Sequence, residues 1–194
     1  MKGKIAIIGK GNVGKALNEG LKREGYETRM TGKGTDVRET AAWGDILILA
    51  VPFNAVDSAV AEMGGAVDGK PIVDVTNPLG PNMELALGFT TSGAEQLQKK
   101  VPSAKVVKAL NTVFAKNMGT GKVRDKAISC FAAGNDQAAK ASVLELARDL
   151  GFDPVDAGPL ANARWLEAMA YMTIQLGYVI NKGLGTAIGL ALVK

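Results

Sequence analysis

The sequence contains no histidine, the side chain that most often serves in acid-base catalysis and in binding zinc. A Ser-His-Asp hydrolase and a His-ligated zinc enzyme are therefore excluded. Any proton that the protein itself transfers must come from lysine, aspartate, tyrosine or water. We predict no metal site and no side chain that is essential as a catalytic acid or base.

Cysteine is nearly absent as well. Cys130 is the single cysteine, so no internal disulfide can form, and a reducing compartment is expected. It stands in the strand-like run Ala-Ile-Ser-Cys-Phe, where a buried and unreactive thiol is expected.

Aromatic residues make up only 5% of the chain, so no stacking surface for nucleic acid is indicated. The net charge is a modest +4, without the dense basic cluster that is typical of nucleic-acid binding. This charge suits a small anionic ligand. We therefore expect small-molecule cofactors as substrates, and no nucleic acid.

Long hydrophobic runs are also lacking. The apolar run behind Lys2 and Lys4 is too short for a signal peptide, and the apolar stretch at 168–180 contains Gln175 and is too short to span a membrane. A cytoplasmic protein without membrane contact is expected. The stretch at 168–180 is predicted to be a buried or dimer-forming helix, which makes a homodimer the expected assembly.

The residues that are present alternate between strand-like and helix-like segments. The expected strands are residues 4–8, 26–30, 46–50, 71–75, 105–110, 126–132 and 153–156. The expected helices are residues 12–24, 53–62, 93–100 and 136–150, with a further short segment at 38–42. Such alternation predicts an α/β fold with a doubly wound, mostly parallel sheet and helices on both faces.

After Gly158 and Pro159, the chain no longer alternates between strand-like and helix-like segments. Residues 161–182 are predicted to form one long helix, and a short terminal helix broken by glycines is expected after it. The helix carries an apolar stripe of Leu166, Met169, Thr173, Leu176 and Ile180. We therefore expect a dinucleotide-binding domain at 1–158 and a helical extension of the same compact unit at 159–194.

A glycine-rich turn connects the first strand to the first helix. The sequence reads Gly9-Lys10-Gly11-Asn12-Val13-Gly14, directly after the apolar run at 5–8. Gly9 would turn the chain off the strand, Gly11 would leave room where backbone meets phosphate, and Gly14 would let the helix pack closely on the strand. The N-terminus of the helix offers free N–H groups to an anion, so this pattern predicts a Rossmann-type dinucleotide site.

The end of the second strand indicates which dinucleotide binds. An acid there would bind the ribose hydroxyls of NAD, but the chain has Thr31, Gly32 and Lys33, which could receive a 2'-phosphate. This favours NADP, although Asp36 keeps NAD as an alternative. Arg29 could face the phosphate or point away from it.

Polar or turn-forming residues also follow three later strands. They are Val51 and Pro52 with Phe53, then Thr76, Asn77 and Pro78, then Asn111 and Thr112. Because ligands of open parallel sheets bind at the carboxyl edge, these exits are expected to converge on one site. Asn-Pro is also an ordinary turn signal, which needs no ligand.

With these residues the chain resembles the NADP-dependent oxidoreductases that act with the deazaflavin coenzyme F420. The resemblance covers nearly the whole chain. It rests on the Gly-Asn-x-Gly loop, the Val51-Pro52 exit, and the segment at 156–164, Asp-Ala-Gly-Pro-Leu-Ala-Asn-Ala-Arg, with Glu167 after it. It implies a Rossmann domain with a small C-terminal helical portion, which passes a hydride between NADP and the deazaflavin.

The resemblance also implies residue roles. Lys10, Asn12 and Val13 would contact pyrophosphate and ribose, and Thr31 with Lys33 would contact the 2'-phosphate. The nicotinamide side would be formed by Val51, Pro52 and Phe53. The second pocket would be formed by Asn77, Pro78, Asn111, Thr112 and Leu160.

The chain departs from the family after its second strand, where Gly32, Lys33 and Gly34 replace the usual serine and arginines. Related membrane-anchored metalloreductases carry a similar domain but use FAD, so FAD or FMN could replace F420. The alternatives are an NADPH-dependent flavin, imine or keto reductase, with Lys108 or Tyr171 as proton donor for an imine or ketone, and a non-catalytic NADP-sensing module.

Overall fold

The computed structural model describes residues 2–32, 36–181 and 188–193. Lys33, proposed above for the 2'-phosphate, lies outside these residues, and so do Lys182, Gly183 and Gly185.

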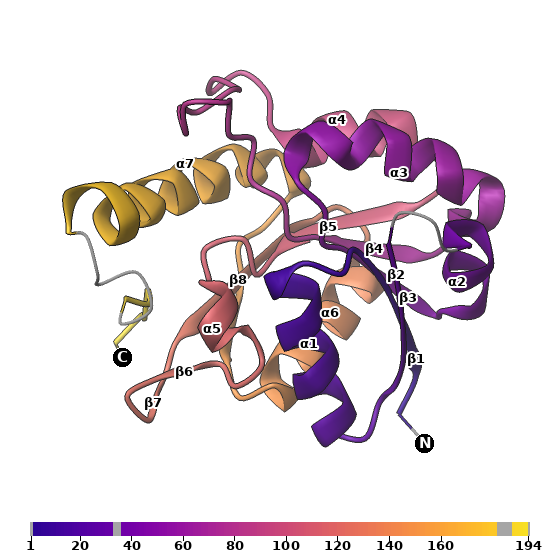
Figure 1. Ribbon diagram of the computed structural model, residues 1–194, viewed down its shortest axis with the longest axis horizontal. Helices are drawn as coiled ribbons and strands as arrows, with labels where there is room; N and C mark the ends of the chain where they lie inside the picture. The colour runs from indigo at the N-terminus through magenta and orange to yellow at the C-terminus, as the bar shows by residue number, and fades with distance from the viewer. Residues whose placement is uncertain (1, 33–35, 182–187, 194) are drawn as a thin grey trace.

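Seven strands of the described chain form one sheet (Figure 1) in the order β2-β1-β3-β4-β5-β8-β9. Neighbouring strands are parallel except β5 and β8, which run antiparallel. The strands are β1 Lys4–Ile8, β2 Glu27–Thr31, β3 Ile46–Leu49, β4 Pro71–Asp74, β5 Lys105–Ala109, β8 Ser129–Gly134 and β9 Asp153–Asp156. The predicted α/β fold with a mostly parallel sheet is confirmed.

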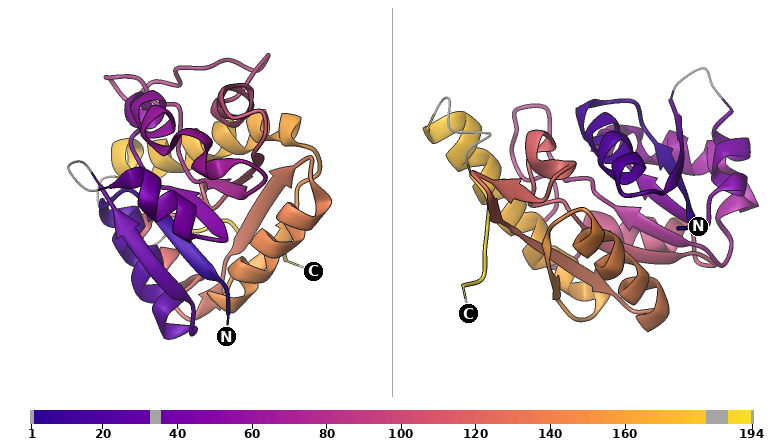
Figure 2. Two further views of the ribbon diagram at one scale, coloured as in Figure 1. Left: turned by 90° about the vertical axis from the view of Figure 1, so that its right-hand side faces the viewer. Right: turned by 90° about the horizontal axis from the view of Figure 1, so that it is seen from below.

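The helices form layers on the two faces of this sheet (Figure 2). They are α1 Asn12–Arg23, α2 Val37–Trp43, α3 Val56–Met63, α4 Gly93–Lys100, α5 Ala115–Met118, α6 Gln137–Asp149 and α7 Ala163–Ile174. Shorter turns are η1 Phe53–Ala55, η2 Gly64–Val67, η3 Leu160–Asn162 and the π-helical η4 Gln175–Ile180, and a small hairpin joins β6 Lys122–Val123 to β7 Lys126–Ala127.

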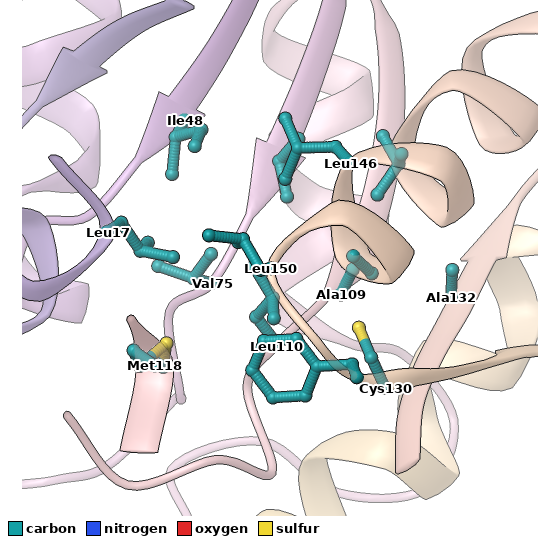
Figure 3. Close-up of a cluster of buried hydrophobic side chains, with 14 of the residues drawn as sticks. Leu17, Ile48, Val75, Ala109, Leu110, Met118, Cys130, Ala132, Leu146 and Leu150 are labelled. Carbon is teal, nitrogen blue, oxygen red and sulfur yellow. The ribbon is translucent and has the colours of Figure 1, made fainter. Parts of the chain in front are cut away.

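Successive side chains of a strand point to opposite faces of the sheet, so neighbouring residues of one strand contact different helices. In β1, Ile5 and Ile7 belong to a core cluster shared with α1, α5 and α6, while Ala6 and Ile8 belong to a second cluster shared with α2, α3 and α4. Figure 3 shows the first cluster, in which Leu17 of α1 and Leu146 of α6 lie on the same side of the sheet. The two buried faces explain why the inner strands are almost entirely apolar.

Cys130 lies in the first cluster with none of its surface exposed. Burial raises the pKa of its thiol to about 12, although a backbone contact with Leu110 partly opposes the shift. The prediction of a buried, unreactive cysteine is confirmed as to burial.

Three expectations for the C-terminal half were wrong in detail. The strand expected at 126–132 is divided between β7, which pairs with β6, and β8, which pairs with β5 and β9. The helix expected from 161 begins at Ala163 and becomes π-helical after Ile174. Residues 188–193 form no terminal helix; instead Leu190 O accepts a 2.8 Å hydrogen bond from Ser129 N beside β8.

No helix within residues 2–32, 36–181 and 188–193 is both long and apolar enough to cross a lipid bilayer.

Candidate dinucleotide-binding site

The glycine loop between β1 and α1 is held by close backbone packing. Gly9 has a φ of 128°, which favours glycine, and a Cβ there would collide with the carbonyl of Ala50 at the end of β3. A Cβ on Gly14 would collide with the carbonyl of Gly9. The Gly9 N–H donates a 2.9 Å hydrogen bond to Thr31 O. The loop is therefore packed between the carboxyl ends of β2 and β3.

Gly11 differs from both, because a Cβ built there would have no atom within 4 Å. It is the residue before α1, and no side chain caps that helix in the described structure. The first turn of α1 also contains no acidic residue. Free N–H groups and the positive end of the helix dipole thus face open space, an arrangement that fits a phosphate group.

A cleft of about 700 Å³ lies over this loop. It lies where β2 and β3 stand on opposite sides of β1, which is where open α/β sheets bind ligands. Its lining residues are Ile8, Gly9, Lys10, Gly11, Gly32, Val37, Ala50, Val51, Pro52, Ala55, Ser58, Ala59 and Glu62. The cleft thus joins the glycine loop to the end of β2 and the exit of β3, as a dinucleotide requires.

The end of β2 brings Lys10 and Gly32 together. A Cβ on Gly32 would stand 3.2 Å from Lys10 Cγ, so the aliphatic part of Lys10 lies across this glycine. Thr31 is buried, with 1% of its surface exposed. This end of the cleft therefore carries the positive charge of a lysine from the glycine loop.

The two other charged residues considered for this end have different partners. Asp36 caps α2 by accepting a 2.8 Å hydrogen bond from Glu39 N. The guanidinium of Arg29 lies 4.6 Å from the ring centroid of Trp43 and 3.8 Å from a carboxylate oxygen of Glu39. Asp36 therefore acts as a helix cap, and Arg29 packs against α2.

The exits of β4 and β5 are joined by two asparagines. Asn77 Nδ2 donates to Asn111 O at 2.9 Å, and Asn111 Nδ2 donates to Asn77 Oδ1 at 3.1 Å and to Leu166 O of α7 at 2.9 Å. Asn111 is 4% exposed, and its Oδ1 is the buried side-chain polar atom without a hydrogen-bond partner in the described structure. The predicted convergence of polar residues thus occurs at these two exits.

Lys108, Asp74 and Glu167 form a buried ionic cluster next to this pair. Lys108 Nζ lies 3.0 Å from Asp74 Oδ2 and 2.9 Å from Glu167 Oε1, and it donates to Thr76 O at 2.6 Å. All three charged side chains are at most 3% exposed. Burial lowers the pKa of Lys108, but the two carboxylates outweigh this effect and hold the pKa above its usual value.

The structure therefore divides the predicted site residues into groups. Gly9, Lys10, Gly11, Gly32, Val51 and Pro52 line the cleft, and Asn12, Val13 and Gly14 form the first turn of α1 beside it. Phe53 packs against Gly93 of α4, Pro78 and Thr112 are buried beside the asparagine pair, and Leu160 is buried in the second core cluster. The residues predicted for the nucleotide end thus lie together, while Leu160 is part of the core.

The sequence reasoning missed two sets of residues. The first is Ser58 and Glu62 on α3, which line the cleft because α3 follows the β3 exit. The second is Asp74 and Glu167, which complete the cluster around Lys108. The signal for the second set was a lysine within the buried run Val106-Val107-Lys108-Ala109, since such a charge needs a buried partner.

The segment at 156–164 forms ion pairs and hydrogen bonds with other side chains of the protein. Asp156 pairs with Lys140 at 2.7 Å, and Arg164 makes two hydrogen bonds of 2.8 and 2.6 Å to Glu95 on α4. This segment, on which the family resemblance partly rests, therefore attaches the start of α7 to α4 and the end of β9 to α6.

The glycine loop, the uncapped helix α1 and the cleft between the ends of β2 and β3 are the features of a Rossmann-type dinucleotide-binding protein. No protein-family model matches the sequence. The sequence is 29% identical over 90% of the chain to the F420-dependent NADP reductase of Methanocaldococcus jannaschii, and the match covers 79% of that protein. It is 29% identical to rat metalloreductase STEAP3 over 86% of the chain, but spans only 36% of that relative.

Among solved structures, a proposed F420-dependent NADP reductase from Arthrobacter sp. FB24 matches with a TM-score of 0.88. It is 29% identical, and the match covers 100% of both chains. The resemblance predicted from the sequence is thereby confirmed: in sequence and fold the chain is similar to NADP-dependent reductases.

Proposed function

We propose that the protein transfers a hydride between NADP(H) and a second ring cofactor, and that this cofactor is the deazaflavin coenzyme F420. The observation that carries the proposal is the continuous cleft from the uncapped N-terminus of α1 to the β3 exit. It occurs in a chain that matches two proteins described as F420-dependent NADP reductases over 90% and 100% of its length.

The cleft and the neighbouring exits of β4 and β5 have separate roles in this proposal. The glycine loop with Asn12 and Val13 holds the pyrophosphate and ribose, and Lys10 with Thr31, Gly32 and Lys33 receives the 2'-phosphate. Residues 51–53 stand beside the nicotinamide ring, and Asn77, Pro78, Asn111 and Thr112 stand beside the second ring. Leu160 acts only from behind this pocket, because it is buried in the core.

Transfer between two stacked rings depends on proximity and orientation, with the reacting atoms about 3 to 3.5 Å apart. The protein then needs to bind and orient its ligands and to exclude water. It does not need to supply a proton, in keeping with a chain that has no histidine.

Lys108 argues against an imine or keto reductase in which it is the proton donor. An ammonium group has three N–H donors, and those of Lys108 have three protein acceptors in the interior. A flavin reductase keeps the same site but takes FAD or FMN as the second cofactor. A non-catalytic NADP-sensing module remains the alternative from a different class.

A screen of hydride acceptors tests these functions. Thermal shifts with NADPH and with NADH first establish the dinucleotide. Stopped-flow mixing of the NADPH-loaded protein with F420, FAD, FMN and a simple cyclic imine or ketone then follows oxidation at 340 nm. We expect rapid oxidation with F420. Transfer to FAD or FMN alone supports the flavin reductase, transfer to the imine or ketone alone contradicts the proposal, and transfer to none supports the sensor.

We further propose a homodimer formed through α7 and η4. Met172 on α7 and Val179 and Ile180 on η4 are 52%, 48% and 61% exposed. The predicted apolar stripe is buried at Leu166 and Thr173 but exposed at Ile180. An exposed apolar face of this kind is typical of an interface between subunits. Residues 1–158 and 159–194 together would form one compact unit in each subunit.

A further inference from the structure

Lys108 occupies an unusual position for a lysine, in the middle of an inner strand with none of its side chain exposed. It is the register partner of Asp74 on β4, and Glu167 reaches it from α7. Its three N–H donors are all taken up by Asp74, Glu167 and Thr76 O. A group with no free donor and no exposed surface cannot bind a ligand directly, so its role must lie in what it holds.

Stability alone is a weak reason for such a cluster. Removing three charges from water costs free energy that their attraction often does not recover, and apolar residues of similar volume commonly stabilise as well or better. What apolar residues cannot do is fix a backbone carbonyl at one distance.

The cluster fixes both polar groups of one peptide position. Thr76 O accepts from Lys108 at 2.6 Å, and Thr76 N donates to Asp74 Oδ1 at 2.9 Å. The next residue is Asn77, whose side chain exchanges hydrogen bonds with Asn111. Since the backbone of Thr76 is held on both sides, the place from which Asn77 reaches Asn111 is held as well.

The same cluster ties this pair to the helices. Glu167 accepts hydrogen bonds from Gly93 N at 2.9 Å and Ala94 N at 3.2 Å, at the N-terminus of α4. The preceding residue, Leu166, accepts from Asn111 Nδ2. One turn of α7 thus contacts both the ionic cluster and the asparagine pair.

In the described structure, Asn111 Oδ1 is left as a buried acceptor without a partner. Both hydrogens of its Nδ2 are used, by Asn77 Oδ1 and Leu166 O, which fixes the orientation of the amide. Buried acceptors are nearly always satisfied in folded proteins, so the position of Asn111 depends on the hydrogen bonds that its Nδ2 and backbone carbonyl do make.

We propose that Lys108 is a positioning residue: held between Asp74 and Glu167, it fixes the Thr76 turn so that Asn77 and Asn111 stay joined at the strand ends where the second ring cofactor is proposed to bind. The part that concerns the cofactor rests on the proposed function. The part that concerns the two asparagines does not, and it can be tested without any reaction.

The test uses the full-length triple variant Asp74→Asn, Lys108→Met and Glu167→Gln. The amide at position 74 keeps the acceptor for Thr76 N, the amide at position 167 keeps one of the two acceptors for α4, and no unpaired charge remains in the interior, so the variant is expected to fold. The variant loses the hydrogen bond to Thr76 O and one hydrogen bond to the N-terminus of α4. The matched control is Asp156→Asn, which removes the carboxylate partner of another buried lysine, Lys140, away from the asparagine pair.

The first readout is the exchange of the side-chain amide protons of Asn77 and Asn111 in 15N-labelled protein. Their signals are assigned from Asn77→Ala and Asn111→Ala. We expect exchange about tenfold faster in the triple variant, as the loss of one hydrogen bond allows, and no change in Asp156→Asn. Unchanged exchange in a folded triple variant overturns the proposal. If the triple variant does not fold, the double variant Asp74→Asn with Lys108→Met is measured with the same expectation and the same refutation, because it also removes the donor to Thr76 O and leaves Glu167 with both N–H donors of α4.

The second readout is kinetic. We expect the KM for F420 to rise about tenfold in the triple variant, with the Kd of NADPH unchanged. A loss of active protein without any change in KM indicates a merely structural role and overturns the positioning of the cofactor. If the wild-type protein reduces no acceptor, the proposed function fails, whereas the exchange measurement still decides the role of Lys108.

Discussion

The aliphatic chain of Lys10 crosses Gly32 at the end of β2, so that a Cβ at position 32 would stand 3.2 Å from Lys10 Cγ and 3.3 Å from Lys10 Cδ. A residue of the glycine loop thus brings its charge to the place where Rossmann proteins distinguish NAD from NADP. A glycine at position 32 makes room for that side chain.

Lys10→Met keeps the aliphatic chain and removes the charge. Because a hydrogen bond to a charged group contributes about 1.5 to 3 kcal/mol, we expect NADPH affinity to fall roughly tenfold to a hundredfold while NADH affinity changes little. Fluorescence titration with both dinucleotides measures this. Lys15→Met, an exposed lysine of α1, is the matched control. An unchanged ratio of the two affinities in Lys10→Met would contradict the assignment.

Two glycines of the loop should respond differently to alanine. A Cβ on Gly11 enters open space, so Gly11→Ala should leave the free energy of unfolding unchanged and weaken NADPH binding by about tenfold or more. A Cβ on Gly14 meets the carbonyl of Gly9, so Gly14→Ala should destabilise the fold by about 1 to 3 kcal/mol. Urea unfolding and NADPH titration separate the two effects. The idea fails if Gly11→Ala binds NADPH as well as the wild type.

The Glu95–Arg164 pair should make stability depend on pH. The hydrogen bonds from Arg164 hold the pKa of Glu95 below its ordinary value of 4.5. A lowered carboxylate pKa stabilises the folded state above pH 4.5, and this contribution is lost as the pH falls through the folded-state pKa.

Glu95→Gln should therefore unfold more easily at pH 7, by about 1 kcal/mol, and match the wild type at sufficiently low pH. Thermal unfolding from pH 7 to pH 3 measures the difference. Glu19→Gln, which changes an exposed carboxylate on α1, is the matched control. A difference that stays constant with pH would exclude the ion pair as its cause.

Cys130 should not react with thiol reagents in the folded protein. Burial excludes the reagent and raises the thiol pKa to about 12, so the thiolate is scarcely present at pH 8. An aromatic disulfide reagent should report no accessible thiol in buffer and one per chain in denaturant. Rapid stoichiometric reaction in buffer would show that the first core cluster opens readily.

The proposed dimer should depend on the exposed face of the C-terminal helix. We expect light scattering at micromolar concentration to give the mass of two chains, and Met172→Asp to give the mass of one. Val193→Asp, which changes an apolar residue with 95% exposure outside that helix, should leave the dimer intact. A wild-type monomer at these concentrations would remove the proposal.

The first half of the fold could be predicted well because its signals are local. The strand at 4–8 was predicted with the bounds of β1, since an apolar run ends there at Gly9. The exposed hairpin was missed because Arg124 and Asp125 adopt positive φ values of 47° and 64° without a glycine or asparagine to signal it. The strand expected at 126–132 is divided because β8 pairs with β5 and β9. These partners are distant in the sequence, so a local pattern could not predict where β8 begins.

The candidate site shows the same distinction. Glycine spacing identified the residues around Gly11 because the three glycines recur at the spacing that a strand-turn-helix dinucleotide site requires. The Lys10 side chain could not be placed, since its position depends on the separate strand that ends before Gly32. The cluster around Lys108 combines three distant segments, and a single sequence indicates only that its buried charge must have partners.

The contacts of Glu167 have a consequence for how the chain can be divided. A gene cut after the codon for Gly158 would encode every strand of the main sheet but would leave Lys108 with one carboxylate and the N-terminus of α4 without the acceptor that now binds it. Such a fragment should lack a single cooperative unfolding transition. The C-terminal helix thus supplies buried contacts to β5 and α4, and we expect that exchanging it for another helix without a carboxylate at position 167 would destabilise the sheet.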